Sequence, residues 1–134
     1  MTKFALDVPV QRREIPDLAM VLELPMLPPS TNHLYFNVPG RGRVKTQKYR
    51  DWSETCGNIL NRQITGRMCG RVDIRIQLED CHRTRDASNT IKPIEDLLVK
   101  VGAIFNDNSK FVRSVKAEWA PIKGVRIEIE RVAA

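Results

Sequence analysis

Two aspartates and the basic residues near them have the chemistry of a site that cleaves phosphodiester bonds. Asp86 follows Arg83 and Arg85 closely in the sequence, and Asp107 lies in a polar turn further along. Hydrolysis of a phosphodiester needs an in-line water and stabilised charge on the phosphate, and divalent cations held by carboxylate oxygens supply both. Asp86 and Asp107 are therefore the candidate metal ligands.

The expected secondary structure sets a geometric condition on such a site. Apolar residues at helical spacing predict a helix that starts close to Asn89 or Thr90, with a polar side chain to cap it, and stops at Gly102. Asp86 and Asp107 then flank a helix of about 11–12 residues, which spans roughly 17 Å if it is straight. They converge only if the chain folds back before this helix, if it returns along it afterwards, or if a dimer brings them together.

Other polar residues of this segment are candidates for catalytic roles, but each also fits a simpler structural explanation. Lys92 is placed to contact the scissile phosphate or the leaving oxygen, but it also lies four residues before Asp96 and can form a surface ion pair worth a few tenths of a kcal/mol. Glu95 and Asp96 are equally compatible with solvated helix acids. Ser88, Asn89 and Asp96 are candidates for orienting ligands or water.

A loop rich in glycine and arginine, Val38–Val44, predicts a hairpin tip or a flexible loop. Glycine lets the backbone approach a ligand closely, and arginine beside it favours a phosphate contact over a solvated loop. The expected DNA-binding residues are Arg41, Arg43, Lys45, Lys48, Arg83 and Arg85.

Composition favours a basic globular protein. The chain has 134 residues with 22 Lys and Arg against 16 Asp and Glu, a formal net charge of +6, which favours a polyanionic partner such as nucleic acid. Cys56, Cys69 and Cys81 have no zinc-site spacing, so we expect reduced thiols in a cytoplasmic protein, nucleoid-associated when bound to DNA. No signal peptide or membrane partner is expected.

Hydrophobic periodicity predicts a single α+β domain in which helices cover a mixed β-sheet. Residues 1–17 are expected to form an N-terminal arm and residues 18–134 the domain. Within it we expect strands at 18–24, 72–79, 114–119 and 125–130, and helices at 47–63 and from about 89 to 102. The last two strands are expected to pair as a hairpin through the turn at 121–124.

The order of several short motifs resembles that of the RusA family of Holliday junction resolvases. The motifs are Pro28-Pro-Ser-Thr-Asn32, Gly40-Arg-Gly-Arg43, Tyr49-Arg-Asp51, Arg85-Asp-Ala-Ser-Asn-Thr-Ile-Lys92, Asp96, Gly102 and Asn106-Asp107. They run from about Leu22 to the final strand. Each motif is short, and their order and spacing together carry the resemblance.

The resemblance implies a RusA-like fold and a homodimeric endonuclease of phage or prophage type. Such enzymes depend on Mg²⁺, with Mn²⁺ as a substitute, bind four-way DNA junctions by their structure and nick two strands symmetrically, which serves DNA recombination and repair. The resemblance assigns metal binding to Asp86 and Asp107, a catalytic lysine to Lys92, a supporting role to Asn89 and a DNA contact to Arg85.

One departure from the family pattern opens an alternative function. Where the best-known members have a second aspartate, this chain has Ser88, whose hydroxyl can position a metal-bound water but brings no charge. Asn106 removes another nearby charge, and Asp96 is the remaining carboxylate if its helix face turns inward. The alternatives are therefore a branched-DNA-binding protein that cleaves weakly or not at all, and a basic scaffold without a preference for junctions.

Overall fold

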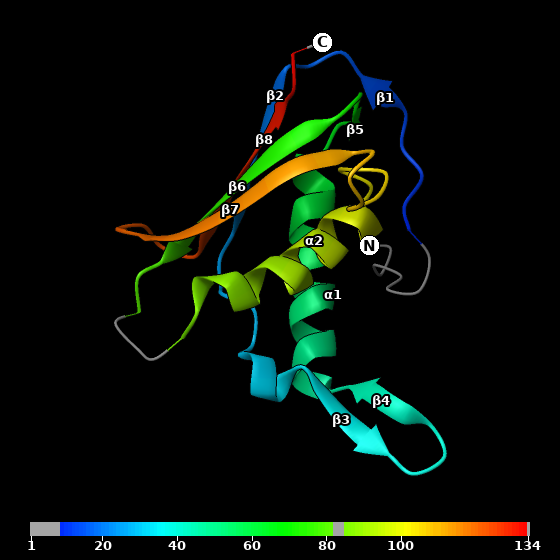
Figure 1. Ribbon diagram of the computed structural model, residues 1–134, viewed down its shortest axis with the longest axis vertical. Coiled ribbons are helices and arrows are strands. Elements are labelled where there is room, and N and C mark those ends of the chain that lie inside the picture. The colour runs from blue at the N-terminus through cyan, green and yellow to red at the C-terminus, as the bar shows by residue number, and fades with distance from the viewer. Residues whose placement is uncertain (1–8, 82–84, 134) are drawn as a thin grey trace.

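A four-stranded mixed sheet with two helices on one face forms the core of the protein (Figure 1). The computed structural model describes residues 9–81 and 85–133. The sheet has the strand order β2-β8-β6-β7, made by β2 (Ala19–Leu24), β6 (Val72–Glu79), β7 (Val112–Ala120) and β8 (Val125–Arg131). The helices are α1 (Gln47–Gln63) and α2 (Ile91–Lys100). The predicted α+β class is confirmed.

Alternating side chains explain why the sheet has one dry face and one wet face. In β6, Val72, Ile74, Ile76 and Leu78 are buried against the helices, and the residues between them point to the opposite face. Burying one such side chain contributes about 1.5–3 kcal/mol. The opposite face carries paired charges across strands, including Arg75 with Glu118 on β7. A face of this kind is solvated and leaves the other face to form the core.

Helix α1 begins and ends where the sequence predicts. Thr46 caps its first turn by accepting a hydrogen bond from the Tyr49 amide at 3.1 Å. Tyr49, Trp52, Cys56 and Leu60 lie at helical spacing and are buried in the core. Burial raises the pKa of the Cys56 thiol to about 12. All three cysteines of the chain are free thiols.

The predicted pairing of the last two strands is wrong. Strand β6 lies between them: β7 pairs with it in parallel and β8 pairs with it antiparallel. The turn after β7 therefore passes around the end of β6, where the Glu79 amide donates to the Gly124 carbonyl and the Asp80 amide to the Ala120 carbonyl. The physical reason is that the connection from β6 through α2 to β7 is a parallel crossover, which places the helix on the sheet.

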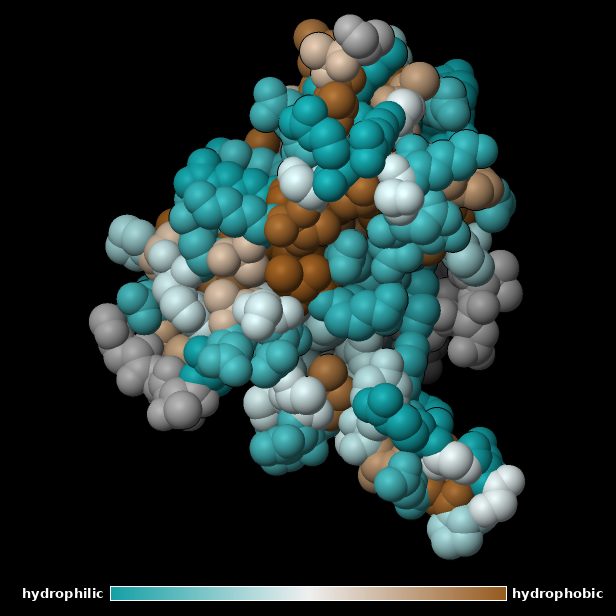
Figure 2. Space-filling view, viewed as in Figure 1, coloured by the Kyte–Doolittle hydropathy of each residue, from teal (hydrophilic) through white to brown (hydrophobic). Residues whose placement is uncertain are grey.

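Short elements complete the chain outside the main sheet. Strands β3 (Tyr35–Val38) and β4 (Gly42–Lys45) form the predicted hairpin, which projects from the body of the molecule (Figures 1 and 2). A 3₁₀ turn, η1 (Thr31–His33), precedes it. No helix in residues 9–81 and 85–133 is long and apolar enough to cross a membrane.

The described part of the N-terminal arm is attached to the domain. Its strand β1 (Glu14–Ile15) pairs in parallel with β5 (Arg67–Met68). Arg12 donates hydrogen bonds to the carbonyls of Val101 and Ile64 and to the Asn61 side chain. The arm thus ties the end of α1 to the end of α2.

Candidate functional site

Lys92, Asp96 and Asp107 form the most concentrated charge cluster among the sequence-predicted site residues. The Lys92 ammonium lies 3.0 Å from Asp96 Oδ1 and 3.1 Å from Asp107 Oδ2. The expected ion pair between Lys92 and Asp96 is therefore confirmed, with a second acid joining it. The lysine side chain is 69% exposed, whereas the two acids are only 27% and 26% exposed. We call these three residues, together with Glu95, the acid–lysine cluster.

The end of α2 explains how Asp107 reaches a lysine in the first turn of that helix. Gly102 adopts a φ of 78°, its amide bonds to the Val99 carbonyl, and the Ala103 amide bonds to the Leu98 carbonyl. This is a Schellman ending, which reverses the chain direction at a left-handed residue. The chain then returns along the helix, which is one of the routes that the sequence left open. Gly102 also ends the helix as predicted.

Hydrogen bonds brace the polar turn that carries Asp107. The Asn106 side chain accepts from the Asn108 amide at 3.2 Å, and the Asn108 side chain accepts from the Lys110 amide at 3.0 Å. Asn106, which the sequence marked as a lost charge, thus has a structural role in shaping the turn.

Electrostatics in the acid–lysine cluster favour a charged Lys92 and, on balance, disfavour ionisation of Glu95. The hydrogen bonds that Lys92 donates, to Asp96 first and then to Asp107, raise the pKa of Lys92 and keep the ammonium charged. Burial raises the pKa of Glu95, the nearby Asp107 and Asp96 charges raise it further, and the Lys92 charge partly offsets them. From the sequence, Glu95 was equally compatible with a solvated helix acid. In the structure it is half-buried and belongs to the cluster, because the chain returns along α2 after the helix ends.

The segment before α2 brings two distant motifs together. The 3₁₀ turn η2 (Ala87–Thr90) follows Asp86 and leads directly into α2. Arg85 donates a hydrogen bond from Nη2 to the Pro28 carbonyl at 2.9 Å, which joins this segment to the Pro-Pro-Ser-Thr-Asn motif. A hollow of about 180 Å³ lies between them, lined by Ser30, Thr31, Asn32, Arg85, Asp86 and Asn89.

The cap of α2 differs in detail from the prediction. Thr90 stands at the predicted start and is fully buried, but its hydroxyl donates to the Ala87 carbonyl at 2.7 Å instead of accepting a helix amide. The 3₁₀ turn before it supplies the Ser88 carbonyl, which accepts the Ile91 amide. Ser88 and Asp86 remain exposed at this turn.

The structure places the two predicted metal ligands in separate settings on either side of the start of α2. Asp86 lines the 180 Å³ hollow at the start of η2, and Asp107 bonds to Lys92 in the first turn of α2. A 3₁₀ turn of four residues, at about 2 Å per residue, separates Asp86 from the start of α2 by roughly 8 Å. Within the described ranges, no three or more His, Cys, Asp or Glu side chains are grouped to hold a metal ion.

The predicted basic residues lie in different settings. Arg43 stacks over the Tyr35 ring at 4.3 Å, and Lys45 lies 5.3 Å from the Tyr49 ring centre. Arg41 is exposed at the hairpin tip. Arg83 lies outside the described residues. Lys48 lines a larger hollow together with Arg85, one that the sequence did not predict.

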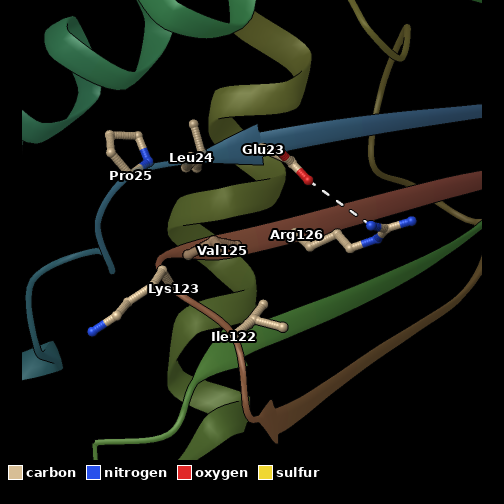
Figure 3. A pocket seen from close by; sticks show the side chains of 7 residues that line it. All are labelled: Glu23, Leu24, Pro25, Ile122, Lys123, Val125 and Arg126. Carbon is tan, nitrogen blue, oxygen red and sulfur yellow. Dashed lines mark ion pairs between the residues drawn. The ribbon is translucent and has the colours of Figure 1, made fainter.

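A hollow of about 470 Å³ at the start of β8 lacks the combination of acids and polar groups found around Asp86 (Figure 3). It lies where the turn before β8 meets the end of β2, and its wall includes Glu23 and Arg126, whose charged groups are 3.9 Å apart. An acid and a base that face each other at this distance largely neutralise their fields. This hollow is therefore a weaker candidate than the region around Asp86.

Neither a scan against protein-family models nor a search of curated proteins gave a match to this chain. The interpretation of the site consequently depends on its residues and their geometry.

Proposed function

We propose that the protein is a structure-selective DNA endonuclease that resolves Holliday junctions by Mg²⁺-dependent hydrolysis of phosphodiesters. The observation that carries the proposal is that Asp96 and Asp107 both contact Lys92 in the first turn of α2. Asp86 and Asn89 lie in the segment that leads into this helix and line the hollow there. The same residues carry the resemblance to the RusA resolvases. Two acids and a lysine from separate segments are thus gathered in one place, which supports a role in phosphodiester hydrolysis.

The donor chemistry fits a hard divalent cation. Asp86, Asp107, Asn89 and Ser88 each offer a side-chain oxygen as a ligand, and Mg²⁺ and Mn²⁺ prefer oxygen to nitrogen or sulfur. Mg²⁺ usually binds one or two carboxylates and completes its shell with water and substrate phosphate, so a small protein donor set suffices. Asp86 and Asp107 are the proposed ligands. A bound cation would lower the pKa of a water molecule and stabilise negative charge on the phosphoryl group.

The remaining side chains bind and orient the DNA. Lys92 stays protonated because two acids hold it, so its ammonium can neutralise a phosphate or a leaving oxygen. Asn89 lines the hollow beside Asp86 and can orient a ligand or a water. The predicted basic residues on the hairpin and at the start of α1 contact the DNA backbone. Phosphate contacts of this kind make binding fall steeply as the salt concentration rises.

The homodimer is part of the proposal because symmetric nicks in two strands need two sites, and each chain carries one. Light scattering or sedimentation in solution tests this directly. A monomer that still nicks junctions in pairs would contradict the proposed dimer while leaving the cleavage chemistry intact.

A nicking assay tests the enzyme. Purified protein is incubated with a mobile four-way junction and with linear duplex at matched salt, in Mg²⁺, Mn²⁺ or EDTA. We expect metal-dependent nicks in the junction and an Asp107→Asn loss of at least about 100-fold. Glu130→Gln is the matched control, because it removes one charge from an exposed position on β8. Nicks that persist in Asp107→Asn would exclude the proposed role of this acid.

A branched-DNA-binding protein without cleavage is the second candidate, and Ser88 favours it. A serine in place of an acid removes a negative ligand, and Lys92 already neutralises part of the acidic charge. Selective junction binding without nicks in either metal ion supports the binder. Equal affinity for junction and linear duplex at matched salt would instead indicate a basic scaffold.

A further inference from the structure

A larger hollow adjoins the one that contains Asp86. It has a volume of about 480 Å³, within the roughly 300–1,000 Å³ of small-molecule sites. Its apolar wall is formed by Met26, Leu27, Pro28, Pro29 and Trp52. We call it the Trp52 hollow.

The wall of the Trp52 hollow is held in place by the fold. Pro28, Pro29 and Trp52 are buried, and the Trp52 indole donates to the Met26 carbonyl at 3.4 Å. Pro28 also accepts the hydrogen bond from Arg85. Flat, rigid side chains that are already fixed lose little conformational entropy when a ligand binds.

Polar and charged groups at the rim have the chemistry of a nucleotide site. Lys48 and Arg85 supply positive charge for a phosphate, beside apolar surface that suits the face of a base. Asp51 and His33 add hydrogen-bonding groups, and His33 is oriented by a 2.7 Å hydrogen bond between its Nδ1 and Ser30 Oγ. The hollow in Figure 3 has a similar volume but no aromatic wall, so size alone does not produce this combination.

The position of Arg85 links the two hollows. Arg85 and Ser30 line both the Trp52 hollow and the smaller hollow with Asp86 and Asn89. A phosphate held at Arg85 would therefore have its nucleoside on one side and the next phosphate towards Asp86 on the other. A base that is already unpaired or unstacked costs less to extrude than a base within a duplex.

We propose that the Trp52 hollow is a subsite for one unpaired or extruded nucleotide next to the phosphate that is cleaved. This inference rests on the proposed nuclease function for its biological meaning. The binding of a nucleotide to the hollow is a separate property, and it can be measured without any cleavage.

Nuclear magnetic resonance of the indole N–H groups tests the subsite on the full chain. The probes are the four deoxynucleoside monophosphates, with inorganic phosphate as the comparison. We expect the Trp52 signal to move with the nucleotides and the Trp119 signal to stay, with Trp119→Phe fixing the assignment. No movement of the Trp52 signal, or the same movement with phosphate alone, would overturn the nucleotide subsite.

A filling variant and its matched control locate the binding. Thr55 is exposed and lines the hollow, whereas Thr65 is exposed and lies beyond the end of α1. We expect Thr55→Tyr to weaken nucleotide binding about tenfold or more, because the added ring would occupy part of the hollow, and Thr65→Tyr to leave it unchanged. Equal affinity in the two variants would contradict the location. Lys48→Ala, a surface change that leaves Arg85 in place, should reduce the preference for monophosphates over nucleosides, and an unchanged preference would contradict its phosphate contact.

The nicking assay separates this inference from the proposed function. Junction nicks together with an unresponsive Trp52 signal would exclude the subsite and leave the nuclease in place. A Trp52 signal that responds to nucleotides in a protein that never nicks junctions would support the subsite and exclude the nuclease.

Discussion

Replacing Lys92 with methionine tests the acid–lysine cluster directly. Methionine preserves much of the apolar stem but removes the ammonium that both Asp96 and Asp107 contact. Because each acid oxygen lies about 3 Å from the same nitrogen, the two oxygens are at most about 6 Å apart. The variant thus loses two ion pairs and leaves two carboxylates facing each other.

The size of the effect follows from this geometry. Lys92 is 69% exposed, so each ion pair is worth only about 0.2–1 kcal/mol after solvent screening. Repulsion between two carboxylates about 6 Å apart adds about 0.7–3 kcal/mol for effective dielectric constants between roughly 80 and 20. Relaxation of the side chains reduces the second contribution. We expect the free energy of unfolding to fall by about 1–2 kcal/mol, which lowers the Tm by roughly 4–7 °C for a chain of this length.

Thermal unfolding followed by circular dichroism measures the change, at low salt with EDTA and again with Mg²⁺. Lys116→Met is the matched control, because Lys116 is 70% exposed and has one ion pair, to Glu118, at 3.8 Å. We expect the control to change the Tm little. Mg²⁺ should raise the Tm of Lys92→Met more than that of the wild type, because the cation replaces the lost positive charge.

A double variant supplies the result that would refute this reasoning. In Lys92→Met with Asp107→Asn, one of the two facing charges is gone, so part of the lost stability should return. A double variant no more stable than Lys92→Met would show that repulsion between the acids is negligible. A Lys92→Met protein as stable as Lys116→Met would show that the cluster contributes nothing to folding.

Two further predictions concern the turn before β8 and the partly buried acid. Gly124→Ala should lower the free energy of urea unfolding by several kcal/mol, because Gly124 has a φ of +67° and an added Cβ would lie 2.0 Å from the Leu24 carbonyl oxygen. Gly40→Ala is the control: Gly40 has a φ of +78° but open space around it, so the cost should be only about 1 kcal/mol. Equal costs for the two variants would contradict the clash at Gly124. Burial raises the Glu95 pKa above its ordinary 4.5, so the folded state holds the proton more tightly than the unfolded state, and ionisation lowers stability as the pH rises through the folded pKa. Glu95→Gln should lack this decrease in urea unfolding as the pH rises above 4.5, and an unchanged pH slope would contradict it.

Local sequence signals predicted helices and strands well where capping or hydrophobic periodicity acted within a few residues. The 47–63 helix has a capping threonine and an apolar stripe that ends at the last turn, and both act within a few residues. The alternation in Val72–Glu79 likewise defines a strand with one wet face. The prediction that the final two strands pair as a hairpin was wrong. It relied on their short separation in the sequence, which favours pairing, but a parallel crossover places β6 between them.

Site prediction followed the same division. The Lys92–Asp96 pair was predictable because residues four apart share a helix face. The contact of Asp107 with Lys92 required the chain to return along α2, which was only one of the possibilities that the sequence left open. Sequence spacing does not reveal in which direction a chain leaves a helix. The burial of Glu95 and the Trp52 hollow had no signal in the sequence, since both depend on contacts between segments far apart in the chain.

The sequence by itself determined the residue types that can bind a hard cation and a phosphate, the two helices, the four strands of the main sheet and the end of α2 at Gly102. Those features depend on periodicity, capping and backbone conformation, which neighbouring residues dictate. Tertiary structure alone decided that Asp107 returns to Lys92, that Arg85 joins the Pro28 segment, and that β6 separates the last two strands. These outcomes depend on how the buried faces of the elements pack together, and no local pattern specifies that packing.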